Sequence, residues 1–144
     1  TTNPRHVKES GKPFLKAIEE IAPLFEKTDK PVSVEVNPHL TDWEQIVEEA
    51  LKLASMSPNF VIKVGACEGG FRAIRELTRQ GVRTNATLIF SVPQAWHAAR
   101  AGASFISPCL GWREAHGDSA WELVPEIAAV LENFNYPAEI IAGN

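Results

Sequence analysis

The sequence has few cysteines and no long apolar run. Cys67 and Cys109 are its two cysteines and lie far apart, so neither a disulfide framework nor a structural zinc site is expected, and both thiols should be reduced. No segment approaches the roughly 18 apolar residues that span a bilayer, and the first residues lack the apolar stretch of a signal peptide. These absences favour a cytoplasmic protein without a membrane partner.

Basic clusters and metal-binding spacings are also missing from the sequence. The formal net charge is −4, and lysine and arginine are scattered along the segments with helical periodicity. A nucleic-acid-binding protein usually carries a basic run or patch, so no nucleic-acid partner is expected. The four histidines lack the spacings typical of a metal site, so no metal is expected. The composition, 44% hydrophobic and 22% charged, indicates a single globular domain over residues 1–144.

The sequence does contain an alternation of short apolar runs and longer segments of helical periodicity. The predicted strands cover residues 32–36, 60–64, 84–90, 104–108 and 138–142. Helices are predicted between them, two of them opening at the capping boxes Thr41-Asp-Trp-Glu44 and Ser119-Ala-Trp-Glu122. About five strands that alternate with helices predict an α/β fold of parallel βα repeats, as an open doubly wound sheet or as a (β/α)8 barrel.

Alternation of side chains along the first three predicted strands chooses between these two folds, because successive residues of a strand point to opposite faces. One face is apolar throughout and carries Val32, Val34, Val36, Phe60, Ile62, Val64, Ala86, Leu88 and Phe90. The other includes Ser33, Glu35, Asn37, Lys63, Asn85, Thr87 and Ser91. A sheet covered by helices on both sides would be apolar on both faces. The polar face therefore predicts part of a (β/α)8 (TIM-type) barrel with a site inside.

Lys63, in the middle of the strand Phe-Val-Ile-Lys-Val, is the most informative residue. Burial removes water from the ammonium and favours the neutral amine, which can add to a ketone and lose water to form an imine. The alternatives are a structural ion pair with Glu35 or a side chain that reaches solvent at the strand end. Asn85, Thr87 and Ser107 fall on the same predicted face, and a structural pair would not need them. These neighbouring polar residues favour Schiff-base chemistry.

Five segments resemble, in order and spacing, the strand motifs of transaldolases and the related fructose 6-phosphate aldolases. They are Thr1-Thr-Asn-Pro4, Val32-Ser-Val-Glu-Val36, Phe60-Val-Ile-Lys-Val64, Thr84-Asn-Ala-Thr-Leu-Ile-Phe-Ser91 and Phe105-Ile-Ser-Pro108. The resemblance covers nearly the whole chain. It implies transfer of a dihydroxyacetone unit between sugar phosphates, in the pentose phosphate pathway, without metal or organic cofactor. A homo-oligomer is an open alternative to a monomer.

The resemblance also implies roles for individual residues. Lys63 would form the imine, and Glu35 with Thr87 would orient the water that moves protons while the imine forms and breaks down. The hydroxyl groups of the donor sugar would be held by Asn3, Asn85 and Ser107.

The sequence departs from the family pattern at three places. It begins at the motif that ends the family's second strand, so the first strand and the C-terminal end of the barrel are expected to be missing from a fragment. Trp112 stands where the family places a phosphate-binding arginine, with Arg113 next to it, and Asn144 stands at a phosphate-binding serine. The alternatives are a simple class I aldolase acting on a related sugar, and a barrel that has lost catalysis and serves as a binding protein.

Overall fold

The computed structural model describes residues 1–117 and 119–143. It contains a parallel sheet in which each strand pairs with the next one along the chain, in the order β1-β2-β3-β4-β5. The strands are β1 (Val32–Glu35), β2 (Phe60–Gly65), β3 (Thr84–Ile89), β4 (Phe105–Pro108) and β5 (Glu139–Ile140). The helices are α1 (Pro4–Glu9), α2 (Phe14–Phe25), α3 (Trp43–Ala54), α4 (Glu68–Arg79), α5 (Val92–Ala101), α6 (Leu110–Ala115) and α7 (Leu123–Asn133).

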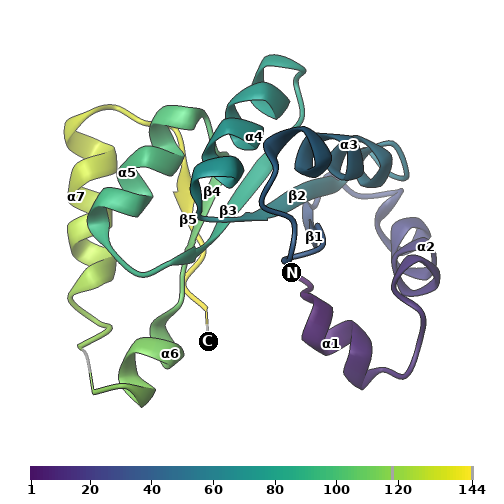
Figure 1. The fold of residues 1–144 in the computed structure, drawn as a ribbon, viewed down its shortest axis with the longest axis horizontal. Helices are drawn as coiled ribbons and strands as arrows, with labels where there is room; N and C mark the ends of the chain where they lie inside the picture. The colour runs from purple at the N-terminus through teal and green to yellow at the C-terminus, as the bar shows by residue number, and fades with distance from the viewer. Residues whose placement is uncertain (118, 144) are drawn as a thin grey trace.

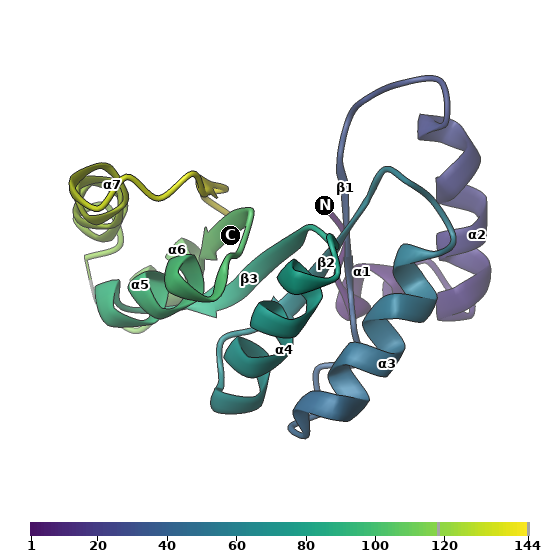
Figure 2. The same ribbon diagram turned by 90° about the horizontal axis from the view of Figure 1, so that it is seen from above.

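The helices surround one side of the strands. In Figure 1, α2, α3, α4, α5 and α7 follow one another in an arc, whereas α1 and α6 lie on the open side of the arc, near the two chain ends. Viewed from above, α3 lies beside α4, and α5 lies beside α7 (Figure 2). Parallel strands in sequential order inside an arc of helices form part of a (β/α)8 barrel, which confirms the predicted fold class. Among the described residues, no helix is both long and apolar enough to cross a membrane.

The core lies between the sheet and the arc of helices. The strands contribute the predicted apolar face, and the helices contribute large side chains that are fully buried. These residues are Val32, Val34, Ile62, Val64, Ala86 and Ile106 from the strands and Ile18, Ile46, Leu53, Ile74, Leu77 and Ile127 from the helices. The opposite face of the sheet, which we call the inner face, includes Ser33, Glu35, Lys63, Asn85 and Thr87. It lies toward the open side of the arc.

A bulge near the end of β3 corrects one part of the predicted alternation. Ala86 pairs with Ile106, but Ile89 rather than Leu88 pairs with Pro108, so β3 contains one extra residue. Leu88 has a φ of 58°, a conformation unfavourable for a leucine, and it is 45% exposed, whereas Ile89 is fully buried. The predicted apolar face is therefore wrong beyond Ala86, because the bulge exchanges the two faces.

The helix starts differ from the two predicted capping boxes. Asp42 rather than Thr41 caps α3, and its carboxylate accepts hydrogen bonds from the backbone N–H groups of Glu44 and Gln45. The second predicted box is wrong, since α7 begins only at Leu123, after a residue whose side chain makes no capping bond. Trp121, inside the predicted box, therefore precedes the helix and is 74% exposed.

Candidate active site

Three neighbouring strands bring polar side chains into one row across the inner face. In the sheet register, Glu35 of β1 pairs with Lys63 of β2, and Lys63 pairs with Asn85 of β3. Paired residues of parallel strands point to the same face, so these three side chains lie side by side. Thr87 lies two residues beyond Asn85 on β3, next to Gly65 of β2. This inner face is the one that a barrel encloses.

Lys63 and Glu35 form a nearly buried ion pair. The Lys63 Nζ lies 3.0 Å from Oε2 of Glu35, and their side chains are 12% and 9% exposed. The Nζ also lies 3.4 Å from the backbone oxygen of Thr2, to which it donates a hydrogen bond. Thr2 is tied to β1 by its own N–H and hydroxyl, which both donate to the oxygen of Ser33. The ammonium thus has acceptors from two directions, and the carboxylate is placed to take its proton.

Asn85 links three strands through hydrogen bonds of its side chain. Its amide NH₂ group donates to the hydroxyl of Ser33 on β1 at 3.1 Å, and its amide oxygen accepts a bond from the hydroxyl of Ser107 on β4 at 2.8 Å. Asn85 is fully buried. The two hydroxyls are thus held in fixed positions on either side of the asparagine, at the base of the inner face.

We expect Asn85→Ala to lower the free energy of unfolding by about 2 kcal/mol, because two hydroxyl groups lose their partner in a site with little access to water. Urea unfolding followed by circular dichroism measures this loss. Asn37→Ala is the matched control, since Asn37 is exposed and should change stability by less than about 0.5 kcal/mol. Equal effects of the two changes would contradict the assigned network.

Thr87 and Asn3 belong to the same neighbourhood, but the described polar contacts of Lys63 go to Glu35 and Thr2 and not to these two residues. Thr87 is buried, 4% exposed, and its backbone oxygen accepts a bond from the N–H of Ala66 at the end of β2. Asn3 caps α1: its side-chain oxygen accepts a bond from the N–H of His6 at 2.8 Å. The structure thus brings Glu35, Lys63, Asn85, Thr87 and Ser107 together, with Asn3 at the edge of the group.

Arg113 lies on α6, which follows β4 directly, and reaches the carboxyl end of β3. Its guanidinium donates to the backbone oxygen of Phe90 at 2.6 Å, while its Nε is buried and has no hydrogen-bond partner among the described residues. Trp112 lies in the same helix, is 55% exposed and stacks on His116. The predicted residue Asn144 lies outside the described residues. Arg113 and Trp112 occupy the rim at which sites of such barrels form.

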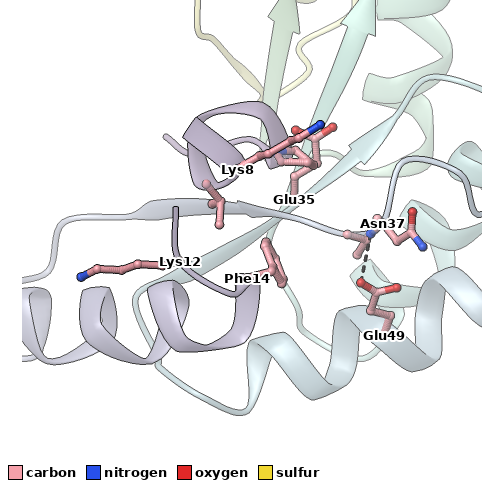
Figure 3. A pocket seen from close by; sticks show the side chains of 9 residues that line it. Lys8, Lys12, Phe14, Glu35, Asn37 and Glu49 are labelled. Carbon is pink, nitrogen blue, oxygen red and sulfur yellow. Dashed lines mark hydrogen bonds between the residues drawn. The ribbon is translucent and has the colours of Figure 1, made fainter. Parts of the chain in front are cut away.

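Two hollows lie at the carboxyl end of β1, and Glu35 lines both of them. The larger, of about 410 Å³, lies between β1 and α1 (Figure 3). Its lining includes Lys8 and Phe14, and the backbone N–H of Asn37 donates to Glu49 there at 3.0 Å. The smaller, of about 160 Å³, is bounded by Glu35, Gly65 and the exposed side chain of the bulge residue Leu88. Lys63 lines neither hollow, and its ammonium lies against Glu35 and the backbone oxygen of Thr2.

Cys109 is a free, half-buried thiol at the carboxyl end of β4. Burial raises the pKa of this thiol, while the positive charge of Lys63 acts in the opposite direction and the negative charge of Glu35 adds to the rise. Both charges are felt at the sulfur, so Cys109 lies near the ion pair. The sequence did not predict a role for Cys109 or Thr2, and strand alternation placed Ser33 on the polar face without a role in the site.

The raised pKa of Cys109 predicts slow alkylation. At pH 8 its thiolate fraction is smaller than that of an ordinary cysteine, and iodoacetamide should modify it about tenfold more slowly than exposed Cys67. The rate should rise as the pH increases through the raised pKa. Peptide mass spectrometry over pH 7–10 measures the two rates separately in one sample, and faster labelling of Cys109 at pH 8 would contradict the assignment.

Comparison with known proteins identifies related sequences. The family model described as "Transaldolase/Fructose-6-phosphate aldolase" matches residues 8–144. A protein of Priestia aryabhattai described as "6-deoxy-6-sulfo-D-fructose transaldolase" is 47% identical over 142 residues, which cover 98% of this chain and 63% of that protein. A "Probable transaldolase" of Clostridium tetani is 42% identical over 144 residues, 100% of this chain and 65% of that protein. The chain thus spans about two thirds of the length of these relatives.

Solved structures with low sequence identity share the fold. A protein of Coccidioides immitis described as a fructose-1,6-biphosphate aldolase superposes with a TM-score of 0.54 at 19% identity, over 88% of this chain and 48% of that one. Inosine 5' monophosphate dehydrogenase of Legionella pneumophila gives the same TM-score at 16% identity, over 88% and 47% of the two chains. At such low sequence identity, these similarities show a shared βα fold and no more, because proteins with one fold can have many activities.

Proposed function

Because the chain belongs to the transaldolase/fructose-6-phosphate aldolase family, we propose that it supplies the Schiff-base site of a transaldolase, with Lys63 as the amine that adds to a ketose carbonyl. One observation carries this proposal: the Lys63 ammonium lies 3.0 Å from Glu35 on the inner face of a barrel sheet. The pair lies beside the buried Asn85 and Thr87. An ion pair with a purely structural role would not require these additional polar side chains.

The first step follows from the geometry of the pair. Glu35 takes a proton from Lys63, and the neutral amine adds to the carbonyl carbon of the donor to form a carbinolamine. Glu35 then returns a proton to the carbinolamine oxygen, directly or through a water held with Thr87, and that oxygen leaves as water. The product is a protonated imine on Lys63. The same carboxylate therefore serves as base and as acid.

The imine then accepts electrons from the bond between the third and fourth carbons of the donor. That bond breaks as the hydroxyl group on the fourth carbon gives its proton to water, an aldehyde leaves, and the three remaining carbons stay on Lys63 as an enamine. In a transaldolase the enamine adds to an acceptor aldehyde, whereas in a simple aldolase it is protonated; hydrolysis of the imine then frees Lys63. Asn85 and Ser107, held together by a 2.8 Å hydrogen bond, are positioned to bind hydroxyl groups of the three-carbon unit. No metal or organic cofactor takes part.

Sugar phosphates of the pentose phosphate pathway are the first candidate substrates, with dihydroxyacetone as the transferred unit in the cytoplasm. A donor with a sulfonate at its sixth carbon is the second. The 47% identity to two Priestia proteins described as 6-deoxy-6-sulfo-D-fructose transaldolases favours it. So does Trp112, which stands where the resemblance implies a phosphate-binding arginine. A sulfonate carries one charge, whereas a phosphate ester carries up to two at neutral pH.

Trapping with borohydride tests the proposal. The purified protein is incubated with fructose 6-phosphate, with 6-deoxy-6-sulfofructose or with dihydroxyacetone, reduced, and analysed by peptide mass spectrometry. An adduct on Lys63 is expected, and the better donor is the hexose that gives faster trapping. An adduct on another lysine would refute the assigned nucleophile, and absence of any adduct would favour a barrel that serves only for binding.

A further inference from the structure

A second group of charged side chains lies on the outer surface of the barrel, away from the site around Lys63. A hollow of about 310 Å³ between α4 and α5 is lined by Phe71, Arg72, Arg75, His97, Arg100 and Ala101. Its lining contains three arginines and no carboxylate. We call this hollow the arginine groove. Helical spacing on two different helices brings these arginines together, although lysine and arginine are scattered in the sequence.

Aromatic rings hold two of the three guanidinium groups in place. Arg72 lies over the ring of Trp43, 5.2 Å from its centroid, and Arg100 lies over the ring of Trp96 at 4.7 Å. A guanidinium that rests on an aromatic face keeps the N–H groups at its edge free to donate hydrogen bonds. The lining also includes His97, whose ring lies 5.8 Å from that of Phe71. The donors are thus partly preorganised before any ligand binds.

The positive charge of the groove is poorly neutralised by the chain. In the described part of the chain, none of the three arginines forms an ion pair with a carboxylate, whereas Arg79 of the same helix pairs with Glu76 at 2.5 Å. Asp42, at the start of α3, has its pKa lowered by hydrogen bonding with Glu44 and Gln45, and Arg72 contributes to the shift. Arg75 and Arg100 are exposed and line the groove. The three arginines of the lining carry like charges, and an anion in the groove would offset their mutual repulsion.

We propose that the arginine groove is a binding site for a small phosphorylated molecule with two or more negative charges. Guanidinium groups match the oxygens of phosphate in pairs of parallel hydrogen bonds, and three of them suit a ligand with more than one charge. A hollow of about 310 Å³ is at the lower end of the range for small-molecule sites. The groove is formed by the helices that follow the strands of Lys63 and Thr87, on their outer side, so its ligand does not compete with the donor sugar.

Isothermal titration of the purified protein with inorganic pyrophosphate at low ionic strength tests this site. The protein carries Arg113→Gln, so that the rim of the active site contributes no guanidinium. One saturable site is expected, and Arg75→Gln in this background should weaken binding about tenfold, because a charge-assisted hydrogen bond is lost. Methanesulfonate, with one charge, should bind at least tenfold more weakly than pyrophosphate.

The matched control is Arg79→Gln, which removes the same charge from the same helix at a position outside the groove. It should change the dissociation constant less than twofold. Equal weakening by Arg75→Gln and Arg79→Gln would overturn the proposal, because it would indicate a diffuse effect of net charge. A change of mass in light scattering upon Arg75→Gln would also overturn it, since the groove would then be an interface between proteins.

Discussion

Lys63→Met should leave no turnover and no adduct that borohydride can trap, with a rate at least roughly 10⁴-fold below that of the unaltered protein. The methionine side chain has a similar length but cannot form an imine. The other lysines that a donor could label are exposed surface residues such as Lys52. Cleavage of fructose 6-phosphate and of its sulfonate analogue, assayed by the aldehyde released, measures the loss. A residual rate within tenfold of the original would contradict the assignment of Lys63.

The same substitution should also lower stability, and this effect separates the ion pair from the chemistry. In Lys63→Met, the Glu35 carboxylate, 9% exposed, loses its cationic partner. An uncompensated charge at such a position lowers the free energy of unfolding by about 3 kcal/mol. The double variant Glu35→Gln/Lys63→Met removes the charge as well and should recover more than half of that loss, while remaining inactive. Urea unfolding of the three proteins gives both values, and no recovery would indicate that the pair is not coupled.

Alternation of side chains made the inner face predictable. The apolar strand residues that pack against the helices are Val32, Val34, Ile62 and Val64. The residues between them therefore face the other side of the sheet. Polar side chains at these positions are informative, because burial of polar groups is costly. Lys63 stands out for this reason without any structure. The neighbouring positions on β1 and β3 follow from the parallel register.

Three features could not be predicted from the sequence, each for a physical reason. The bulge at Leu88 needs a positive φ, and a leucine carries no local signal for that conformation. The contact of Lys63 with the backbone oxygen of Thr2 spans 61 residues and depends on how α1 folds back. The arginine groove arises from two helices whose rotation about their axes is fixed only by packing. Tertiary geometry determined all three.

The turn from β2 into α4 should be the place where one added methyl group has the largest effect on both stability and activity. A Cβ at Gly70 would lie 2.0 Å from the backbone oxygen of Gly65, far inside van der Waals contact. Gly65 ends the strand of Lys63, and Gly70 lies in the first turn of α4, where its N–H donates to the sulfur of Cys67. Because the Cβ is fixed rigidly to the helix backbone and its partner is a backbone oxygen, relief requires the strand and the helix to move apart.

Gly70→Ala should therefore lower the free energy of unfolding by about 3 kcal/mol and reduce turnover by roughly 10²-fold, because Lys63 moves with the end of its strand. Gly65→Ala is the matched control: its Cβ would meet nothing closer than a side-chain carbon of Leu88 at 3.6 Å, so stability should change by less than about 1 kcal/mol. Urea unfolding and the rate of borohydride trapping measure the two effects. If Gly70→Ala and Gly65→Ala have the same free energy of unfolding, α4 does not approach the end of β2 as closely as described. The turn would then not be what positions Lys63.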